Sequence, residues 1–139
     1  MKRYEVINHT ADLAIHAYGE TLPQLFENLA IGMLESIADL EKIDEKVKID
    51  IEVEGETLED LLVAWLGELI FRHEVDEILF KRVEIIRFDN TSLHGAAYGE
   101  MVDSQKHVIY TEIKNATYHQ LKVERLDDGN WETTVIFDI

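Results

Sequence analysis

The stretch from Lys46 to Glu54 alternates polar and apolar side chains without a fault, which limits the folds open to this chain. Alternation with a period of two is typical of a β-strand with one face in water and the other in the core. Antiparallel sheets commonly expose one face in this way, whereas strands of parallel sheets are buried on both faces. Similar but weaker alternation predicts seven further strands, at 3–8, 12–19, 79–88, 91–99, 107–115, 119–125 and 130–138.

Two other stretches, 22–37 and 58–70, repeat apolar residues every three or four positions, which is the period of one helix face. Thr21 and Thr57 stand where a side chain is expected to cap each helix. Two helices and about eight short strands predict an α+β fold of two layers, a mostly antiparallel sheet with both amphipathic helices packed on one face. An all-parallel, doubly wound sheet is not expected, because too few helices separate the strands.

The composition narrows the class of protein. A chain of 139 residues has the length of one domain, spanning 1–139, and its 46% of hydrophobic residues exclude intrinsic disorder. The absence of cysteine excludes a disulfide scaffold, a thiolate metal site and a cysteine nucleophile. No apolar run of about 18 residues and no secretory segment is found, so a cytoplasmic protein without a membrane partner is expected.

The balance of acidic and basic residues limits the kinds of molecule that this protein is expected to bind. Thirteen basic and 29 acidic residues give a formal net charge of −16. Proteins that bind nucleic acids neutralise phosphates with basic patches, so strong direct binding of RNA or DNA is not expected. A protein this acidic is better suited to bind cations or the basic surface of another protein.

The common catalytic and nucleotide-binding motifs are absent: the chain has no G-x-G-x-x-G, G-x-x-x-x-G-K-[ST], G-x-S-x-G or H-E-x-x-H. None of the six histidines forms a ligand pair spaced along one helix, and each taken alone is expected to be a surface or edge-strand histidine. His9 stands out because it shares a short polar loop with Asp12.

Two acidic segments are candidates for a metal site. The first is the loop from Asn8 to Asp12, and the second is the end of the chain, where Asp138 and the main-chain carboxylate of Ile139 are neighbours. If the two segments are adjacent in the fold, three carboxylates converge, and oxygen ligands suit Ca²⁺, Mg²⁺ or Mn²⁺. The alternatives are a turn aspartate that binds nearby N–H groups and a frayed, solvated end of the chain.

Several motifs resemble the archease family, in order along the whole chain. They are Tyr4-Glu-Val-Ile-Asn-His-Thr-Ala-Asp12, Ala17-Tyr-Gly19, Thr57-Leu-Glu-Asp-Leu-Leu62 with Trp65-Leu66, Thr111-Glu-Ile-Lys114, Thr117-Tyr-His119 and Val135-Ile-Phe-Asp-Ile139. Archeases are accessory proteins of the RtcB-type RNA ligase, which joins tRNA exon halves and acts in RNA repair. The ligase itself carries the catalytic histidine, the Mn²⁺ ions and the guanylate. The resemblance therefore implies a non-catalytic activator that promotes guanylylation and multiple turnover of this ligase.

The resemblance also implies which residues act. Asp12, Asp138 and the carboxylate of Ile139 correspond to the family's metal site, with Ca²⁺ favoured over Mg²⁺ and Mn²⁺, and Lys114 is implicated with Asp12 and Asp138 in activating the partner. The family usually has Asp-His-Thr-Ala-Asp, whereas this chain has Asn8 in the first position. Asn8 and His9 are expected to contact the metal ligands, and not the metal, and so to orient them. Because Asn8 replaces the family's aspartate, the loss of that carboxylate is expected to weaken metal binding.

Two other functions remain open from the sequence. A stand-alone metal-dependent enzyme that acts on a phosphorylated small molecule would use the same carboxylates to hold a catalytic ion. A general chaperone would require a large exposed apolar patch.

Overall fold

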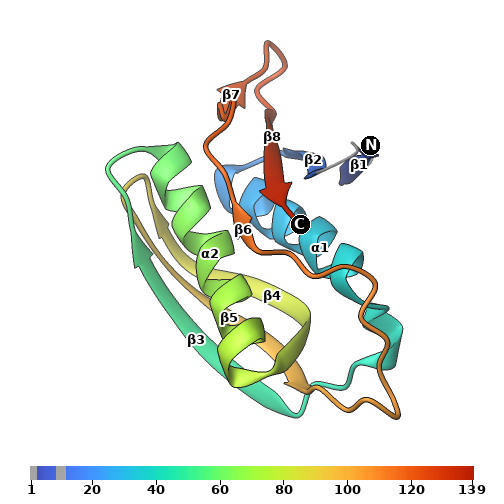
Figure 1. Cartoon of the computed structure of the whole chain (residues 1–139). Coiled ribbons are helices and arrows are strands. Elements are labelled where there is room, and N and C mark those ends of the chain that lie inside the picture. Colours follow the sequence, from blue (N-terminus) through green and yellow to red (C-terminus); the bar gives the residue numbers. More distant parts are fainter. Residues whose placement is uncertain (1–2, 9–11) are drawn as a thin grey trace.

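A computed structural model of the chain describes residues 3–8 and 12–139, with two helices that lie between two antiparallel sheets (Figure 1). The first sheet has the strand order β1-β2-β8-β6, and β7 pairs with β8. The second sheet has the order β3-β5-β4. The α+β class, the antiparallel pairing and the two helices are confirmed, and the strands divide between two sheets.

The bounds of the elements follow the chain order. They are β1 (Tyr4–Asn8), β2 (Asp12–Gly19), α1 (Leu22–Ile37), a 3₁₀ turn (Leu40–Lys42), β3 (Val47–Glu54), α2 (Leu58–Asp76), β4 (Ile78–Asp89), β5 (Ser92–Met101), β6 (Asn115–Ala116), β7 (Glu124–Arg125) and β8 (Trp131–Asp138).

Both helices begin where the sequence predicts. The hydroxyl of Thr21 accepts a hydrogen bond from the Gln24 N–H at 3.2 Å, and that of Thr57 accepts one from the Asp60 N–H at 3.0 Å. Each bond satisfies one of the N–H groups that a helix leaves free in its first turn. Neither helix in the described ranges is long and apolar enough to span a membrane.

The core joins the two helices to both sheets. Both α1 and α2 contact strands of the first and of the second sheet. The fully buried Trp65 of α2 donates a hydrogen bond from Nε1 to the main-chain oxygen of Phe26 in α1, at 3.1 Å. Its ring packs over Gly95 of β5, where an added Cβ would lie 2.9 Å from the ring, so this close approach requires glycine.

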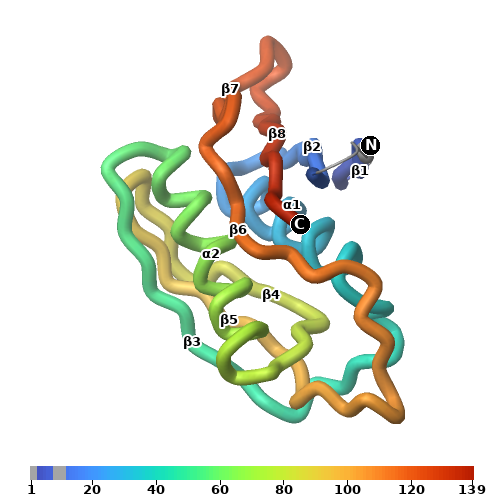
Figure 2. The backbone as a smooth tube through the Cα atoms, in the orientation of Figure 1, coloured from blue at the N-terminus to red at the C-terminus, as the bar shows by residue number. Residues whose placement is uncertain are grey.

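The strands predicted at 107–115 and 119–125 are largely wrong, because only Asn115–Ala116 and Glu124–Arg125 pair with a neighbour. The chain that follows β5 instead runs irregularly past the C-terminal end of α1 to β6 (Figure 2). The Tyr110 N–H donates to the oxygen of Ile37 at 2.7 Å, and the His107 N–H donates to the oxygen of Asp103 at 2.7 Å. These bonds replace those of a strand ladder.

Candidate functional site

The register of β2 and β8 places Asp12 directly opposite Asp138. Eight antiparallel pairs run from this pair to Gly19 opposite Trp131. Directly opposed residues of an antiparallel pair share one face of the sheet, with Cβ atoms about 4.5–5.5 Å apart. The two aspartates predicted from opposite ends of the chain therefore meet on one face of the sheet.

Side chains farther along the same two strands reinforce this register. The ring of His16 on β2 lies between two residues of β8, with Nδ1 bonded to the hydroxyl of Thr134 and Nε2 at 3.0 Å from the Glu132 carboxylate. His16 and Thr134 are directly opposed in the register. This cross-strand contact holds the strand pair that positions Asp12 and Asp138.

The Oδ1 atom of Asp12 is buried and has no hydrogen-bond partner among the described residues. A buried acceptor left unsatisfied costs about 1–3 kcal/mol, and like charges directly opposite each other in a sheet are also destabilising. A cation between the two carboxylates would relieve both costs, so the residues present fit a hard metal ion.

Ile139 directly follows β8 and is 41% exposed. The third predicted ligand, the main-chain carboxylate of Ile139, thus follows the residue that pairs with Asp12. In residues 3–8 and 12–139 no group of three or more His, Cys, Asp or Glu side chains is arranged to hold a metal ion. A site here would therefore combine two side-chain carboxylates with main-chain oxygen.

The structure brings Lys114 next to Asp138 through the main chain. The Lys114 N–H donates to the Asp138 oxygen at 2.8 Å, and the following residue, Asn115, pairs with Asp138 in the β6–β8 register. The Lys114 side chain is exposed, and none of the ion pairs found in the described part of the chain involves it. Three of the predicted positions, 12, 114 and 138, thus lie side by side.

Of Asn8 and His9, the two residues predicted to orient the metal ligands, the structure describes only the backbone of Asn8. Asn8 is the last residue of β1, and its backbone pairs with that of Leu13 in the β1–β2 hairpin. This pairing puts position 8 beside the start of β2, next to Asp12. The side chain of Asn8 and the whole of His9 lie outside the described residues.

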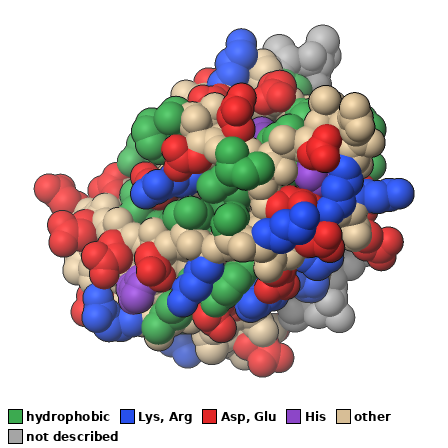
Figure 3. All heavy atoms as spheres, turned by 90° about the horizontal axis from the view of Figure 1, so that it is seen from below, with side chains coloured by type: hydrophobic (Ala, Val, Ile, Leu, Met, Phe, Trp, Pro, Cys, Tyr) green, Lys and Arg blue, Asp and Glu red, His purple; other side chains and the backbone are tan. Residues whose placement is uncertain are grey.

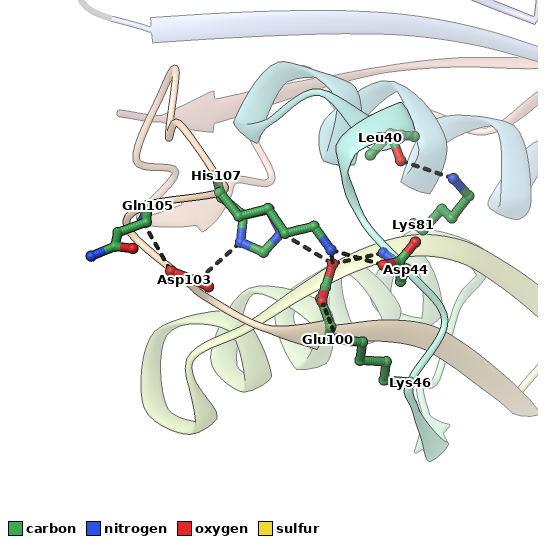
Figure 4. A network of polar contacts seen from close by, with 9 residues as sticks. Leu40, Asp44, Lys46, Lys81, Glu100, Asp103, Gln105 and His107 are labelled. Carbon is green, nitrogen blue, oxygen red and sulfur yellow. Dashed lines mark hydrogen bonds and ion pairs between the residues drawn. The ribbon is translucent and has the colours of Figure 1, made fainter.

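A polar cluster that the sequence analysis missed fixes the segment leading to Lys114 (Figure 4). At its centre is Glu100, whose side chain is only 6% exposed. The Glu100 carboxylate accepts hydrogen bonds from the Asp44 N–H at 2.7 Å, from Lys106 Nζ at 2.7 Å and from His107 Nε2 at 3.1 Å. Lys46 adds an ion pair at 3.5 Å. The cluster joins the end of β5 to the segment that follows it.

These contacts shift the ionisation of the cluster. The hydrogen bond from Lys106, followed by that from the Asp44 N–H, lowers the pKa of Glu100 to about 2. Hydrogen bonds to Asp44 and Glu100 raise the pKa of Lys106 above its usual value. The cluster therefore keeps Glu100 ionised and Lys106 charged at neutral pH.

Two histidines differ from the expected surface or edge positions. His107 is 6% exposed, and its Nδ1 accepts a hydrogen bond from the Asp103 N–H at 3.0 Å, so its hydrogen is on Nε2 and points to Glu100. His73 on α2 is 8% exposed. No spacing in the sequence identifies these two. The partner of His73 is the main-chain oxygen of Ile78 at the start of β4, and those of His107 are Glu100 of β5 and the Asp103 N–H.

The described residues define a small acidic α+β protein in which an N-terminal hairpin and the last strand hold two carboxylates face to face. A model of the Archease protein family (MTH1598/TM1083) matches residues 4–139. The protein archease of Pyrococcus furiosus is 44% identical over 142 residues, with 100% of both chains covered. The chain belongs to the archease family.

Solved structures agree with this membership. The solution structure of protein 1598 of Methanobacterium thermoautotrophicum is 32% identical, with a TM-score of 0.82 and 100% of both chains covered. A crystal structure from Thermotoga maritima, described as an archease and possible chaperone, is 28% identical, with a TM-score of 0.68 and 97% of this chain and 96% of that chain covered.

Proposed function

We propose that this protein is a non-catalytic activator of an RtcB-type RNA ligase, which promotes guanylylation and multiple turnover of the ligase in tRNA splicing and RNA repair. The observation that supports this proposal most directly is the Asp12–Asp138 pair, because the family resemblance implicates these two residues and the strand register makes them neighbours. We expect the protein to act in the cytoplasm, without strong direct binding to nucleic acids and without a membrane partner.

In this proposal Asp12, Asp138 and the carboxylate of Ile139 hold a divalent cation, with Ca²⁺ favoured over Mg²⁺ and Mn²⁺. The bound ion supplies positive charge between the two opposed carboxylates. The residues of the chain do the positioning: β2 and β8 fix the two carboxylates, and β8 also fixes Lys114 through its main chain. The result is a rigid polar end of the sheet that combines acidic groups with one exposed ammonium.

The net charge of −16 supports a protein partner with a basic surface. An RNA ligase binds the phosphate backbone and so carries basic patches. Opposite charges steer such a pair together and raise the association rate, whereas like charges keep this protein away from free tRNA.

A guanylylation assay with the cognate ligase tests the proposal. Removal of Ile139, or Asp138→Ala, should abolish the stimulation and leave the fold intact, as measured by circular dichroism. The matched control is Asp127→Ala, which removes an exposed aspartate in the turn before β8 and should stimulate normally. If the protein without Ile139 stimulates like wild type, the end of the chain is not the working part.

A second candidate function is a general chaperone. The Thermotoga maritima relative is described as a possible chaperone. On the face drawn in Figure 3, apolar side chains gather near the centre, with acidic and basic side chains around them. Suppression of the aggregation of several unrelated proteins, without any effect on the ligase, would favour this function over the first.

A further inference from the structure

A second polar feature lies at the C-terminal end of α2. An open pocket of about 250 Å³ separates the last turns of α2 from the segment that follows β5. Its lining residues are His73, Glu74, Glu77, Val102, Ile109 and Glu112. The proposed function uses none of these residues, although Glu112 lies within the family motif Thr111-Glu-Ile-Lys114.

The ring of His73 lines this pocket and faces Glu112. The residue is more than nine-tenths buried, and its Nδ1 lies 2.9 Å from the main-chain oxygen of Ile78. A carbonyl oxygen can only accept, so Nδ1 carries the hydrogen and Nε2 keeps its lone pair in the neutral ring. The Oε2 atom of Glu112 is 3.8 Å from Nε2, which is beyond hydrogen-bond distance. When the ring is neutral, Nε2 and the Glu112 carboxylate are thus two acceptors that face each other.

The pocket also concentrates negative charge. Glu74 and Glu77 lie at the C-terminal end of α2, where the free main-chain carbonyls already form the negative end of the helix dipole. Neither takes part in the ion pairs found in the described part of the chain, whereas their neighbour Asp76 is paired with Arg72 at 3.1 Å. With Glu112, the pocket has three carboxylates beside the His73 ring, so it favours a cationic group.

The lining of the pocket distinguishes between kinds of cation. Residues 3–8 and 12–139 contain no set of three or more His, Cys, Asp or Glu side chains placed as metal ligands, which argues against an ion in this pocket. Val102 and Ile109 provide apolar wall beside the carboxylates. A lysine or arginine side chain matches this combination, because it joins an aliphatic stem to a charged head with several donors.

The adjoining face of α2 offers further contact area. Phe71 is 52% exposed and Val75 is 60% exposed, and they lie one turn apart. Phe71 is also three residues before Glu74, so this exposed apolar pair borders the pocket on the helix surface. Large exposed apolar side chains beside a charged pocket are a common arrangement in surfaces that bind other proteins.

We propose that this pocket binds a lysine or arginine side chain of a basic protein partner, with the head between His73 Nε2 and Glu112 and the stem against Val102 and Ile109. The net charge of −16 gives the long-range attraction that such a partner requires. The proposal uses residues other than Asp12 and Asp138, so it stands or falls independently of the metal site and of ligase activation.

The test is a titration of the full-length protein with short blocked peptides, followed by NMR of the His73 ring. The peptides Ala-Lys-Ala and Ala-Arg-Ala supply the cation, and the matched neutral peptides replace the basic residue with norleucine or citrulline. A cationic peptide should shift the His73 signal in a saturable way, and the neutral peptides should bind at least about tenfold more weakly, as expected for loss of a charged hydrogen bond.

Two variants separate the pocket from the general acidity of the protein. Glu112→Gln should weaken binding of the cationic peptide by about tenfold or more. Glu52→Gln removes the same charge from an exposed position on β3 and should leave binding unchanged. Three results would overturn the proposal: no shift with either cationic peptide, equal shifts with the neutral peptides, or equal weakening by Glu52→Gln and Glu112→Gln.

Discussion

At the scale of single residues, Asp12 and Asp138 are opposed carboxylates, and the buried Oδ1 of Asp12 has no described donor. Such a pair lowers the stability of the folded state unless a cation or a donor lies between the two groups. Residues kept in an unfavourable arrangement are frequently those that act in function. This unfavourable arrangement is the physical reason to regard Asp12 and Asp138 as a candidate functional site.

The first prediction concerns Asp138→Asn. Without divalent ions, the variant should be as stable as wild type or more stable by about 0.2–1 kcal/mol, because a like-charge pair is removed. With Ca²⁺ at about a hundred times its dissociation constant, wild type should gain about 2.7 kcal/mol of unfolding free energy and the variant much less. Urea denaturation with and without Ca²⁺ measures both effects. A variant that gains as much as wild type would contradict the account.

The second prediction concerns Glu100→Gln. The pKa of Glu100 is lowered from 4.5 to about 2 in the folded protein, so its ionised form stabilises the fold above pH 4.5. This stabilisation is lost as the pH falls from 4.5 through about 2. The variant should be less stable than wild type at pH 7, and the difference should shrink as the pH approaches 2. Denaturation midpoints at pH 7, 4 and 2.5 measure this trend, and a constant difference would refute it.

At the scale of the elements, α2 contains a glycine that packing does not require. A Cβ added at Gly67 meets no atom within 4 Å. Gly67→Ala should therefore stabilise the protein by about 0.5–1 kcal/mol, since alanine favours the helix and restricts the unfolded chain. Gly32→Ala in α1 is the matched control, because its Cβ would lie 2.9 Å from the ring of Tyr4 and the gain should be lost. Thermal unfolding of both variants measures the contrast.

The sequence predicts where individual helices and strands lie along the chain better than it predicts which strand or sheet each one contacts. The spacing of apolar residues and the capping threonines locate both helices, since these signals act within a few residues. The predicted strands at 107–115 and 119–125 fail because a pattern of side chains does not say whether a partner strand is available. The division of the strands into two sheets is likewise absent from the pattern, because a helix stripe shows which residues are buried but not against which sheet.

The candidate site shows the same limit. The β1–β2 hairpin and the end of β8 can each be predicted locally, but the opposition of Asp12 and Asp138 depends on a register between segments at the two ends of the chain. The carboxylates alone make both segments candidates for a metal site, and the family resemblance adds the expectation that Asp12, Asp138 and Ile139 act together. The Glu100 cluster escaped prediction because its members come from three separated segments.

At the scale of the whole molecule, the two sheets and the helices between them make one connected hydrophobic core. β2 and β8 are central strands of the first sheet, so the carboxylate pair is carried by rigid elements and not by a loose end. The irregular segment between β5 and β6 starts at the Glu100 cluster, passes the acidic pocket and reaches Lys114 beside β8. The two proposed contact regions are thus connected through one segment.

The most direct test of the central claim is calorimetric titration of the full-length protein with Ca²⁺, and with Mg²⁺ and Mn²⁺ in separate experiments. The account predicts one saturable site for at least one of these ions, weakened by about tenfold or more in Asp12→Asn and in Asp138→Asn and retained in Asp127→Asn. Absence of binding of all three ions, or wild-type affinity in both site variants, would show that the opposed carboxylates are not a metal site.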